Sequence, residues 1–255
     1  MRLPAIPAGM NAKAWPPVLA TRGPGWRGAL HSHHSLHFVL AMEGELRVRT
    51  SAAGRWWSAA GVLTASDAPH AVDSEGVGML VVFLDPESDA AATMRPALVR
   101  PVRPFSASER DALAREVLPR TVMRFSADEW VRNAAATLQV SIPPSQHMIH
   151  PQVRRLLAML RAGGIDDATS LEALASAVGL SPSRLMHVFT ASIGIPLRPY
   201  LAWLRLQRAA TAIVNQSSLG DAAHAAGFAD AAHMSRTFRR MLGVAPSSLR
   251  PMRCL

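Results

Sequence analysis

The chain has 255 residues, of which 49% are hydrophobic, and a formal net charge of +9. This length suits two modest domains with ordinary hydrophobic cores. We expect no membrane partner, because no apolar run is long enough to cross a bilayer and the first residues lack the pattern of a signal peptide. The single cysteine, Cys254, excludes a disulfide framework and favours a cytoplasmic location.

The basic excess lies in the C-terminal part of the chain. Residues 147–255 contain 12 arginines and 5 acidic residues, a net charge of +7, whereas residues 1–146 have a net charge of +2. A basic segment favours a polyanion as partner, because each phosphate that it neutralises releases condensed counterions. Arginine outnumbers lysine 26 to 1, a bias that phosphate binding or genome composition could equally produce.

The N-terminal half has the pattern of short antiparallel strands. Residues 1–30, rich in proline and glycine, are expected to form a loose arm that joins the first strand. Beyond this arm, the apolar runs 36–41, 45–50, 55–65 and 77–85 are separated by turn signals. Closely spaced strands of this kind predict an antiparallel sandwich or barrel, which we place in a first domain, residues 1–104.

Residues 105–146 change to a helical pattern and are predicted to form a helical linker. Ser106 or Ser108 could cap a first helix that ends near position 118, and Ser126 could cap a second that ends near position 140. The segment lies between the two domains, where a homodimer contact would be useful.

Residues 147–255 are predicted to form an all-α domain. Three prolines within 141–151 mark the approach to it. Pro151 then suits the first turn of a helix that closes at Gly163–Gly164. The predicted fold class is therefore α+β, with an antiparallel β-barrel first, then linker helices, then the helical domain.

The last third of the chain contains the same pattern twice. Four positions of the first copy, Leu171, Gly179, Phe189 and Gly194, recur in the second copy as Leu219, Gly227, Phe238 and Gly243. Each copy is a short apolar helix, a glycine turn, and a second helix that ends in phenylalanine and glycine. This order is typical of a helix-turn-helix unit, and two such units point to a protein that contacts two stretches of a DNA duplex.

The first copy carries clear start signals for both of its helices. Thr169 or Ser170 can cap the first helix, Gly179 allows a tight turn, and Ser181 followed by Pro182 starts the second helix. An apolar stripe would hold the second helix to its partner: Leu185, Phe189 and Ile193. The opposite face presents the candidate base-contacting residues Ser183, Arg184, Met186 and His187.

The second copy repeats this arrangement. Gly227 provides the turn, and Asp230 is a plausible cap for the second helix. The expected buried stripe comprises Met234, Phe238 and either Met241 or Leu242. The candidate DNA-contacting residues are Ala231, Ala232, Ser235, Arg236 and Arg239. Alanines permit close approach to thymine methyl groups, and arginine can donate two hydrogen bonds to guanine.

A long amphipathic helix over 197–215 is predicted to join the two copies. Successive major grooves on one face of B-DNA lie about 34 Å apart, so a rigid connector suits two recognition helices. A single pattern of this kind is often only a packed helical hairpin. Two copies in register within the basic segment favour double-stranded DNA as the partner.

The duplicated region resembles the AraC/XylS family of bacterial transcription regulators over residues 150–250. The resemblance rests on SLEALASAVGLSPSRLMHVFTASIGIPLRPYLAWLRLQRA, which begins at Ser170, and on AAGFADAAHMSRTFRRMLGVAPSSLR, which begins at Ala225. It implies that 182–193 and 230–242 are the recognition helices. It also implies base contacts from Ser183, Met186, His187, Ala231, Ala232, Ser235 and Arg236.

Histidines cluster in the N-terminal half, in the run HSHHSLH and again at His70. His31, His33 and His37 share parity, so on one extended strand they would face the same side. The spacing resembles the first cupin motif, with His37 where that motif usually has glutamate, and His70 stands where the second motif has histidine. Such imidazoles could hold a divalent ion of Zn, Fe, Ni or Cu, or could bind an organic effector through hydrogen bonds. His34, on the other face, is expected to be a polar or interface residue.

Two functions follow from these patterns. We expect a sequence-specific DNA-binding transcription regulator, not an enzyme, gated by a small molecule or a metal in the cupin-like barrel. The alternative is a metal-dependent cupin oxygenase or isomerase with a helical appendage, which only the histidines support. We find no nucleophile elbow, phosphate-binding loop or acid–base pair in the sequence.

Overall fold

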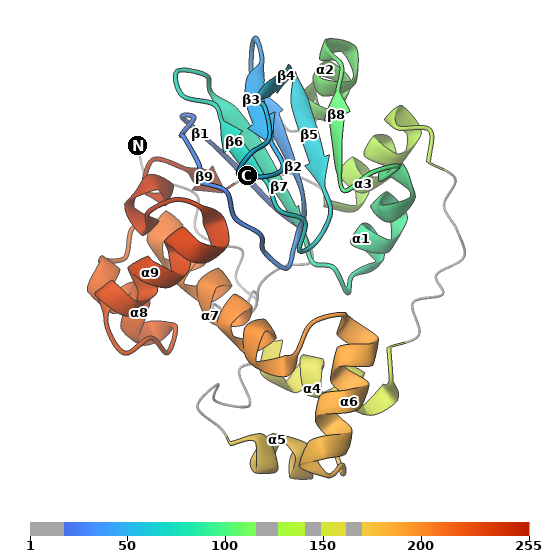
Figure 1. The fold of residues 1–255 in the computed structure, drawn as a ribbon, viewed down its shortest axis with the longest axis vertical. Helices are drawn as coiled ribbons and strands as arrows, with labels where there is room; N and C mark the ends of the chain where they lie inside the picture. The colour runs from blue at the N-terminus through green and yellow to red at the C-terminus, as the bar shows by residue number, and fades with distance from the viewer. Residues whose placement is uncertain (1–17, 116–126, 141–148, 162–169, 255) are drawn as a thin grey trace. The chain divides into compact units, whose positions relative to one another are not determined.

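The computed structural model describes residues 18–115, 127–140, 149–161 and 170–254. They group into two compact units (Figure 1). One unit holds residues 148–208, and the other holds residues 16–147 together with 209–255. The boundary falls within the helix α7, so the two helix-turn-helix copies lie in different units.

The larger sheet provides the framework of the second of these units. Within the described residues it is six-stranded and antiparallel, in the order β8-β5-β2-β7-β1-β9 (Figure 1). Its strands are β1 (Val18–Gly23), β2 (Leu36–Ala41), β5 (Gly61–Thr64), β7 (Met79–Leu84), β8 (Val102–Phe105) and β9 (Arg253–Cys254). The long ladders of β7 with β1 and β2 place the most apolar strands at its centre.

A smaller sheet has the order β4-β3-β6 within the described part of the chain. Its strands are β3 (Leu46–Arg49), β4 (Trp57–Ala59) and β6 (Ala71–Asp73). Alternate side chains such as Leu46 and Val48 are fully buried and join Val39, Val62 and Val81 of the larger sheet in one core. The two sheets therefore enclose a shared apolar layer, as expected for an antiparallel sandwich or barrel.

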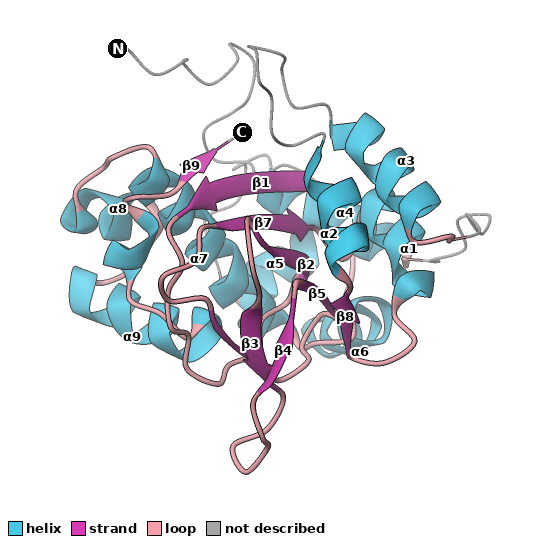
Figure 2. Cartoon of the chain, turned by 90° about the horizontal axis from the view of Figure 1, so that it is seen from above, coloured by secondary structure: helices cyan, strands magenta, loops and turns pink. Residues whose placement is uncertain are grey.

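Helices cover the other face of the larger sheet (Figure 2). They are α1 (Asp89–Met94), the 3-10 turn η1 (Arg95–Ala97), α2 (Ala107–Arg115) and α3 (Ala127–Thr137). Trp130 of α3 meets Phe38 edge-on, with ring centroids 5.0 Å apart. Ser106 caps α2 through a capping box, because its hydroxyl accepts from Glu109 N and its own N–H donates to the Glu109 carboxylate.

The sequence predicted this half of the fold in class but not in every strand. The α+β class and the strands over 36–41 and 77–85 are confirmed. The expectation of a loose arm is wrong for residues 18–23, which form β1 between β7 and β9. The run 55–65 is two strands, because β4 joins the smaller sheet and β5 the larger. Ser126 lies outside the described residues.

The remaining helices form the two helix-turn-helix copies. In the first unit they are α4 (Pro151–Arg161), α5 (Leu171–Ala177), α6 (Pro182–Ile193) and the start of α7 (Leu197–Val214). The second copy consists of α8 (Leu219–Ala225), α9 (Ala231–Leu242) and the turn η2 (Pro246–Leu249), and it packs in the same unit as the sheets. Pro151 begins α4 as predicted, whereas Gly163–Gly164 lies outside the described residues. Among the helices that the structure describes, none has the length and apolarity needed to cross a bilayer.

Candidate nucleic-acid interface and histidine cluster

The first helix-turn-helix copy is formed by α5 and α6. Ser170 caps α5 by accepting a hydrogen bond from Ala173 N, and Ser181 caps α6 by accepting one from Arg184 N. Gly179, in the turn between them, has a φ of 72°, a left-handed conformation that glycine adopts without steric cost. The two capping serines and the turn glycine are therefore the residues that the sequence predicted for these roles.

The buried stripe of α6 determines which face reaches solvent. Leu185 and Phe189 are completely buried, and the Phe189 ring meets Tyr200 with centroids 5.3 Å apart. The opposite face is exposed at all four candidate base-contacting positions, Ser183, Arg184, Met186 and His187. Met186 is 47% exposed, so this large apolar side chain is not part of the core.

The second copy repeats the construction with different residues. Asp230 caps α9 by accepting from His233 N, and Ser218 caps α8 by accepting from Asp221 N. The predicted stripe is confirmed at Met234 and Phe238, which are completely buried, but not at its third position, since Met241 and Leu242 are only partly buried. Both recognition helices are therefore anchored by an apolar side and held at their N-terminal ends by a capping side chain.

The recognition face of α9 is also accessible. Ala232, Arg236 and Arg239 are exposed, and Ala231 and Ser235 are partly exposed. None of these five side chains is turned into the core. The individual base contacts stay predictions, but the face that would make them is available in both copies.

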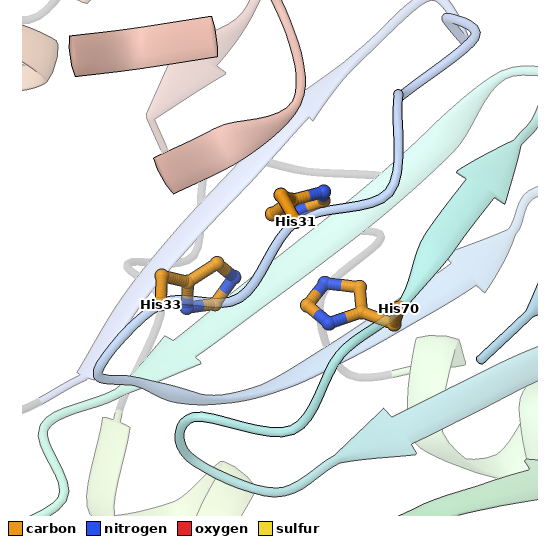
Figure 3. Close-up of side chains that lie close together, drawn as sticks. All are labelled: His31, His33 and His70. Atoms are coloured by element: carbon orange, nitrogen blue, oxygen red, sulfur yellow. The ribbon is translucent and has the colours of Figure 1, made fainter. Parts of the chain in front are cut away.

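The histidine cluster is built from two connecting segments: His31 and His33 lie between β1 and β2, and His70 lies between β5 and β6. His31 and His70 form an isolated antiparallel bridge, in which each backbone N–H donates to the other residue's carbonyl at 2.9 Å. Figure 3 shows the rings of His31, His33 and His70 turned toward one another. Their ring centroids are 4.2 Å apart for His31–His70, 5.5 Å for His31–His33 and 5.3 Å for His33–His70.

The prediction that His31, His33 and His37 share one extended strand is wrong. β2 begins only at Leu36, and the backbone turns before it, where the His33 carbonyl accepts hydrogen bonds from Ser35 N and Asp67 N. The rings converge nevertheless, because the backbone bridge between His31 and His70 brings the segment of His31 and His33 next to His70. Parity along one strand was therefore the wrong reason for the expected convergence.

Within the part of the chain that the structure describes, His31, His33 and His70 bring their ligand nitrogens within 4.8 Å of one another. His37 lies beside them in β2, with its ring 4.9 Å from that of His70 and stacked on Phe83 at 5.7 Å. Phe83 of β7, which the sequence did not single out, thus forms an apolar floor under the cluster.

Burial lowers the pKa of these imidazoles. Burial and the nearby His31 ring lower the pKa of His70 to about 3. Burial holds the pKa of His33 and His37 well below the ordinary value of 6.5, and the neighbouring imidazoles lower it further. The pKa of His31 is also lowered by burial, against the opposing effect of its hydrogen bond to Ala29. The rings are therefore neutral near pH 7, the form that binds metal ions.

Backbone carbonyls fix the tautomer of two of the rings. Nδ1 of His31 donates to the Ala29 carbonyl at 2.8 Å, and Nδ1 of His70 donates to the Ala68 carbonyl at 2.8 Å. A neutral ring that donates from Nδ1 carries its lone pair on Nε2, and such hydrogen bonds commonly orient histidines that ligate metals. Neutral, oriented imidazoles are a donor set that can hold Zn, Ni, Cu or Fe.

His34 has a different environment from its neighbours. Its Nδ1 lies 2.7 Å from Asp67 Oδ2 and its Nε2 lies 2.8 Å from Glu87 Oε1, with the side chain 4% exposed. Burial alone would lower the pKa of His34, but the hydrogen bonds and charges of the two carboxylates raise it to about 9. Of the two expected roles, a polar residue or an interface residue, the structure supports the first, because the buried His34 ring joins two loops through hydrogen bonds to Asp67 and Glu87.

The sequence did not reveal a contact between the cluster and the second helix-turn-helix copy. The Ala29 N–H donates to the carbonyl of Gly243, the residue that ends α9. Gly243 has a φ of 69° and lies so close to the 29–31 segment that a Cβ there would be 2.5 Å from His31 Nδ1. The repeat marked Gly243 only as a helix end, so no pattern could have paired it with Ala29.

Comparisons with known proteins agree on the C-terminal part of the chain. A model of a helix-turn-helix domain matches residues 174–252. The transcriptional regulator RipA of Corynebacterium glutamicum is 30% identical over 105 residues, which are 41% of this chain and 32% of that protein. The chain therefore spans about a third of the length of this relative.

The similarity to solved structures covers nearly the whole chain. ToxT from Vibrio cholerae O395 is similar over 91% of this chain and 95% of its own, with a TM-score of 0.59 and 11% identity. A second ToxT structure from Vibrio cholerae, with an unsaturated fatty acid bound, has a TM-score of 0.56 at 12% identity and covers 92% of this chain and 94% of its own. The helix-turn-helix domain expected from the duplicated sequence is thus confirmed over residues 174–252, and the fold of the chain, an N-terminal sheet domain followed by this helical part, is similar to that of ToxT.

Proposed function

We propose that this chain is a sequence-specific DNA-binding transcription regulator whose N-terminal sheet domain binds an effector. One observation carries the proposal: in both helix-turn-helix copies the apolar stripe is buried and the opposite face of the recognition helix is exposed. In α6 that face offers Arg184 and His187, and in α9 it offers Arg236 and Arg239 beside two alanines. These are the side chains that hydrogen-bond guanine or approach thymine methyl groups in a major groove.

Charge supports double-stranded DNA as the partner. The excess of seven positive charges in residues 147–255 supplies phosphate contacts, which position a domain on the duplex without specifying sequence. The exposed side chains of α6 and α9 would then provide specificity. Affinity should fall steeply with salt concentration while the preferred sequence stays the same.

The effector is proposed to bind at the histidine cluster or in the apolar layer beside it. Three neutral imidazoles suit a divalent transition metal, with His31, His33 and His70 as ligands and His37 adjacent. An organic small molecule is the second candidate, because the fatty-acid-bound ToxT has a similar fold. A ligand of either kind shifts the protein between states only by its different affinity for them.

Selection of bound duplexes from a random pool tests the proposal directly. The selection is run on the full chain with and without divalent metal, at two salt concentrations. A regulator yields one enriched sequence at both salt concentrations, with weaker binding at the higher one. Binding without any enriched sequence would reduce the chain to a nonspecific DNA-binding protein, and no binding would refute the proposal.

The histidine cluster also supports a second candidate, a metal-dependent cupin oxygenase or isomerase. Metal analysis of the purified chain separates the two candidates. Stoichiometric iron together with consumption of O₂ would favour the enzyme, and a metal without such turnover would favour a sensor.

A further inference from the structure

A three-residue segment joins the histidine cluster to the second helix-turn-helix copy. Nδ1 of His31 donates to the Ala29 carbonyl at 2.8 Å, and the Ala29 N–H donates to the Gly243 carbonyl at 2.9 Å. His31 is a candidate metal ligand, and Gly243 ends the recognition helix α9. The segment 29–31 therefore carries both a ligand and a docking contact.

The docking contact depends on close approach. A Cβ at Gly243 would lie 2.4 Å from the Ala29 carbonyl oxygen and 2.5 Å from His31 Nδ1. Only a residue without a side chain fits against this segment. Movement of His31 and Ala29 toward the cluster would lengthen the hydrogen bond to Gly243 and open the contact.

A bound metal would draw the three rings together. Nitrogens held at 2.0–2.1 Å by one tetrahedral ion are about 3.4 Å apart, whereas the upper limit on the separation of the three ligand nitrogens is 4.8 Å. A pair at that limit would close by about 1.4 Å on binding the ion. His33 and His70 are 3% and 2% exposed, whereas His31 is only partly buried, so His31 has the most freedom to move.

We infer that a divalent transition metal bound by His31, His33 and His70 loosens the second helix-turn-helix copy from the sheet domain by drawing the segment 29–31 away from Gly243. This regulation rests on the proposed function for its biological meaning. Because coupling between two binding events is reciprocal, undocking of Gly243 also raises metal affinity. The copy keeps a second attachment, since Met252 is buried in the core and β9 pairs with β1.

The duplication supplies a matched pair of variants. Gly194 ends α6 with a φ of 89°, and a Cβ there would meet nothing within 4 Å, whereas Gly243 ends α9 with a φ of 69° against the 29–31 segment. Alanine at either position imposes similar backbone strain on a helix end. Only Gly243→Ala also drives a methyl group into Ala29 and His31.

Co²⁺ is the probe, added to the full chain in the absence of DNA. Its binding is followed by visible absorption and calorimetry, and exchange of the Ala29 amide is followed by hydrogen–deuterium exchange. We expect Co²⁺ to accelerate exchange at Ala29 in the wild type. Gly243→Ala should bind Co²⁺ more tightly by a factor on the order of ten, Gly194→Ala should match the wild type, and His33→Ala should lose Co²⁺ binding.

Two results would overturn the inference. One is Co²⁺ binding that leaves Ala29 exchange unchanged, a measurement on the wild type that does not depend on the folding of any variant. The other is equal Co²⁺ affinity in the wild type and both glycine variants. Neither measurement involves DNA, so a failed duplex selection would refute the regulator while leaving this coupling intact.

Discussion

The two carboxylates that hold the buried His34, an exposed one from Asp67 and a buried one from Glu87, make the stability of the sheet-containing unit depend on pH. The pKa of His34 is raised from 6.5 to about 9 by Asp67 and Glu87, while the neighbouring His33 has a lowered pKa and stays neutral. Between pH 6.5 and about pH 9, His34 keeps a proton in the folded state that it releases in the unfolded chain. At 1.36 kcal/mol per pH unit, this difference amounts to about 3 kcal/mol. That stabilisation is complete below about pH 6.5 and is lost as the pH rises through about 9.

Urea denaturation at pH 6.5 and pH 9.5, with a chelator present, measures this loss. Tryptophan fluorescence reports on the unit, because Trp130 is buried in its core. The double variant Asp67→Asn, Glu87→Gln removes both negative charges, so its free energy of unfolding should change much less between the two pH values. The same decline in the wild type and in this variant would refute the assignment of the effect to His34.

Three further predictions concern the sheets and the DNA interface. Because the pKa of His70 is lowered to about 3, the free energy of unfolding should fall as the pH drops below about 6.5, and His70→Gln should reduce that fall in the same urea assay. Phe38→Ala, which removes a completely buried ring next to Trp130, should lower the free energy of unfolding by about 3–5 kcal/mol. Arg236→Ala should weaken binding to the selected duplex by about 1–3 kcal/mol more than binding to random DNA, whereas Arg240→Ala, an exposed arginine of the same helix outside the candidate set, should weaken both equally. Equal losses for Arg236→Ala in a competition assay would identify that residue as a phosphate contact.

Local signals predicted the helical part of the chain well. Ser170, Ser181 and Asp230 were predicted as caps from residue type and spacing, and each accepts the expected backbone hydrogen bond. A capping side chain, a left-handed glycine and an apolar stripe that repeats about every fourth residue each depend on residues close together in the sequence. They are therefore encoded where they act, and the candidate DNA interface followed from them.

Long-range pairing was not predictable in the same way. The strand β1 follows a proline-rich stretch and gains its order from β7, more than fifty positions away in the chain. His34 was assigned by strand parity, whereas its partners Asp67 and Glu87 come from two distant loops. The Ala29–Gly243 contact depends on how two segments from opposite ends of the chain meet. No local pattern carries that information.

Gly194 and Gly243 occupy the same position in the two copies, but their surroundings differ. Asparagine, which tolerates left-handed backbone, should replace Gly194 at little cost, because the space around that position is open. The same replacement at Gly243 would collide with the loop beneath it. The same helix-ending position therefore tolerates substitution in the first copy and is fixed as glycine by packing in the second.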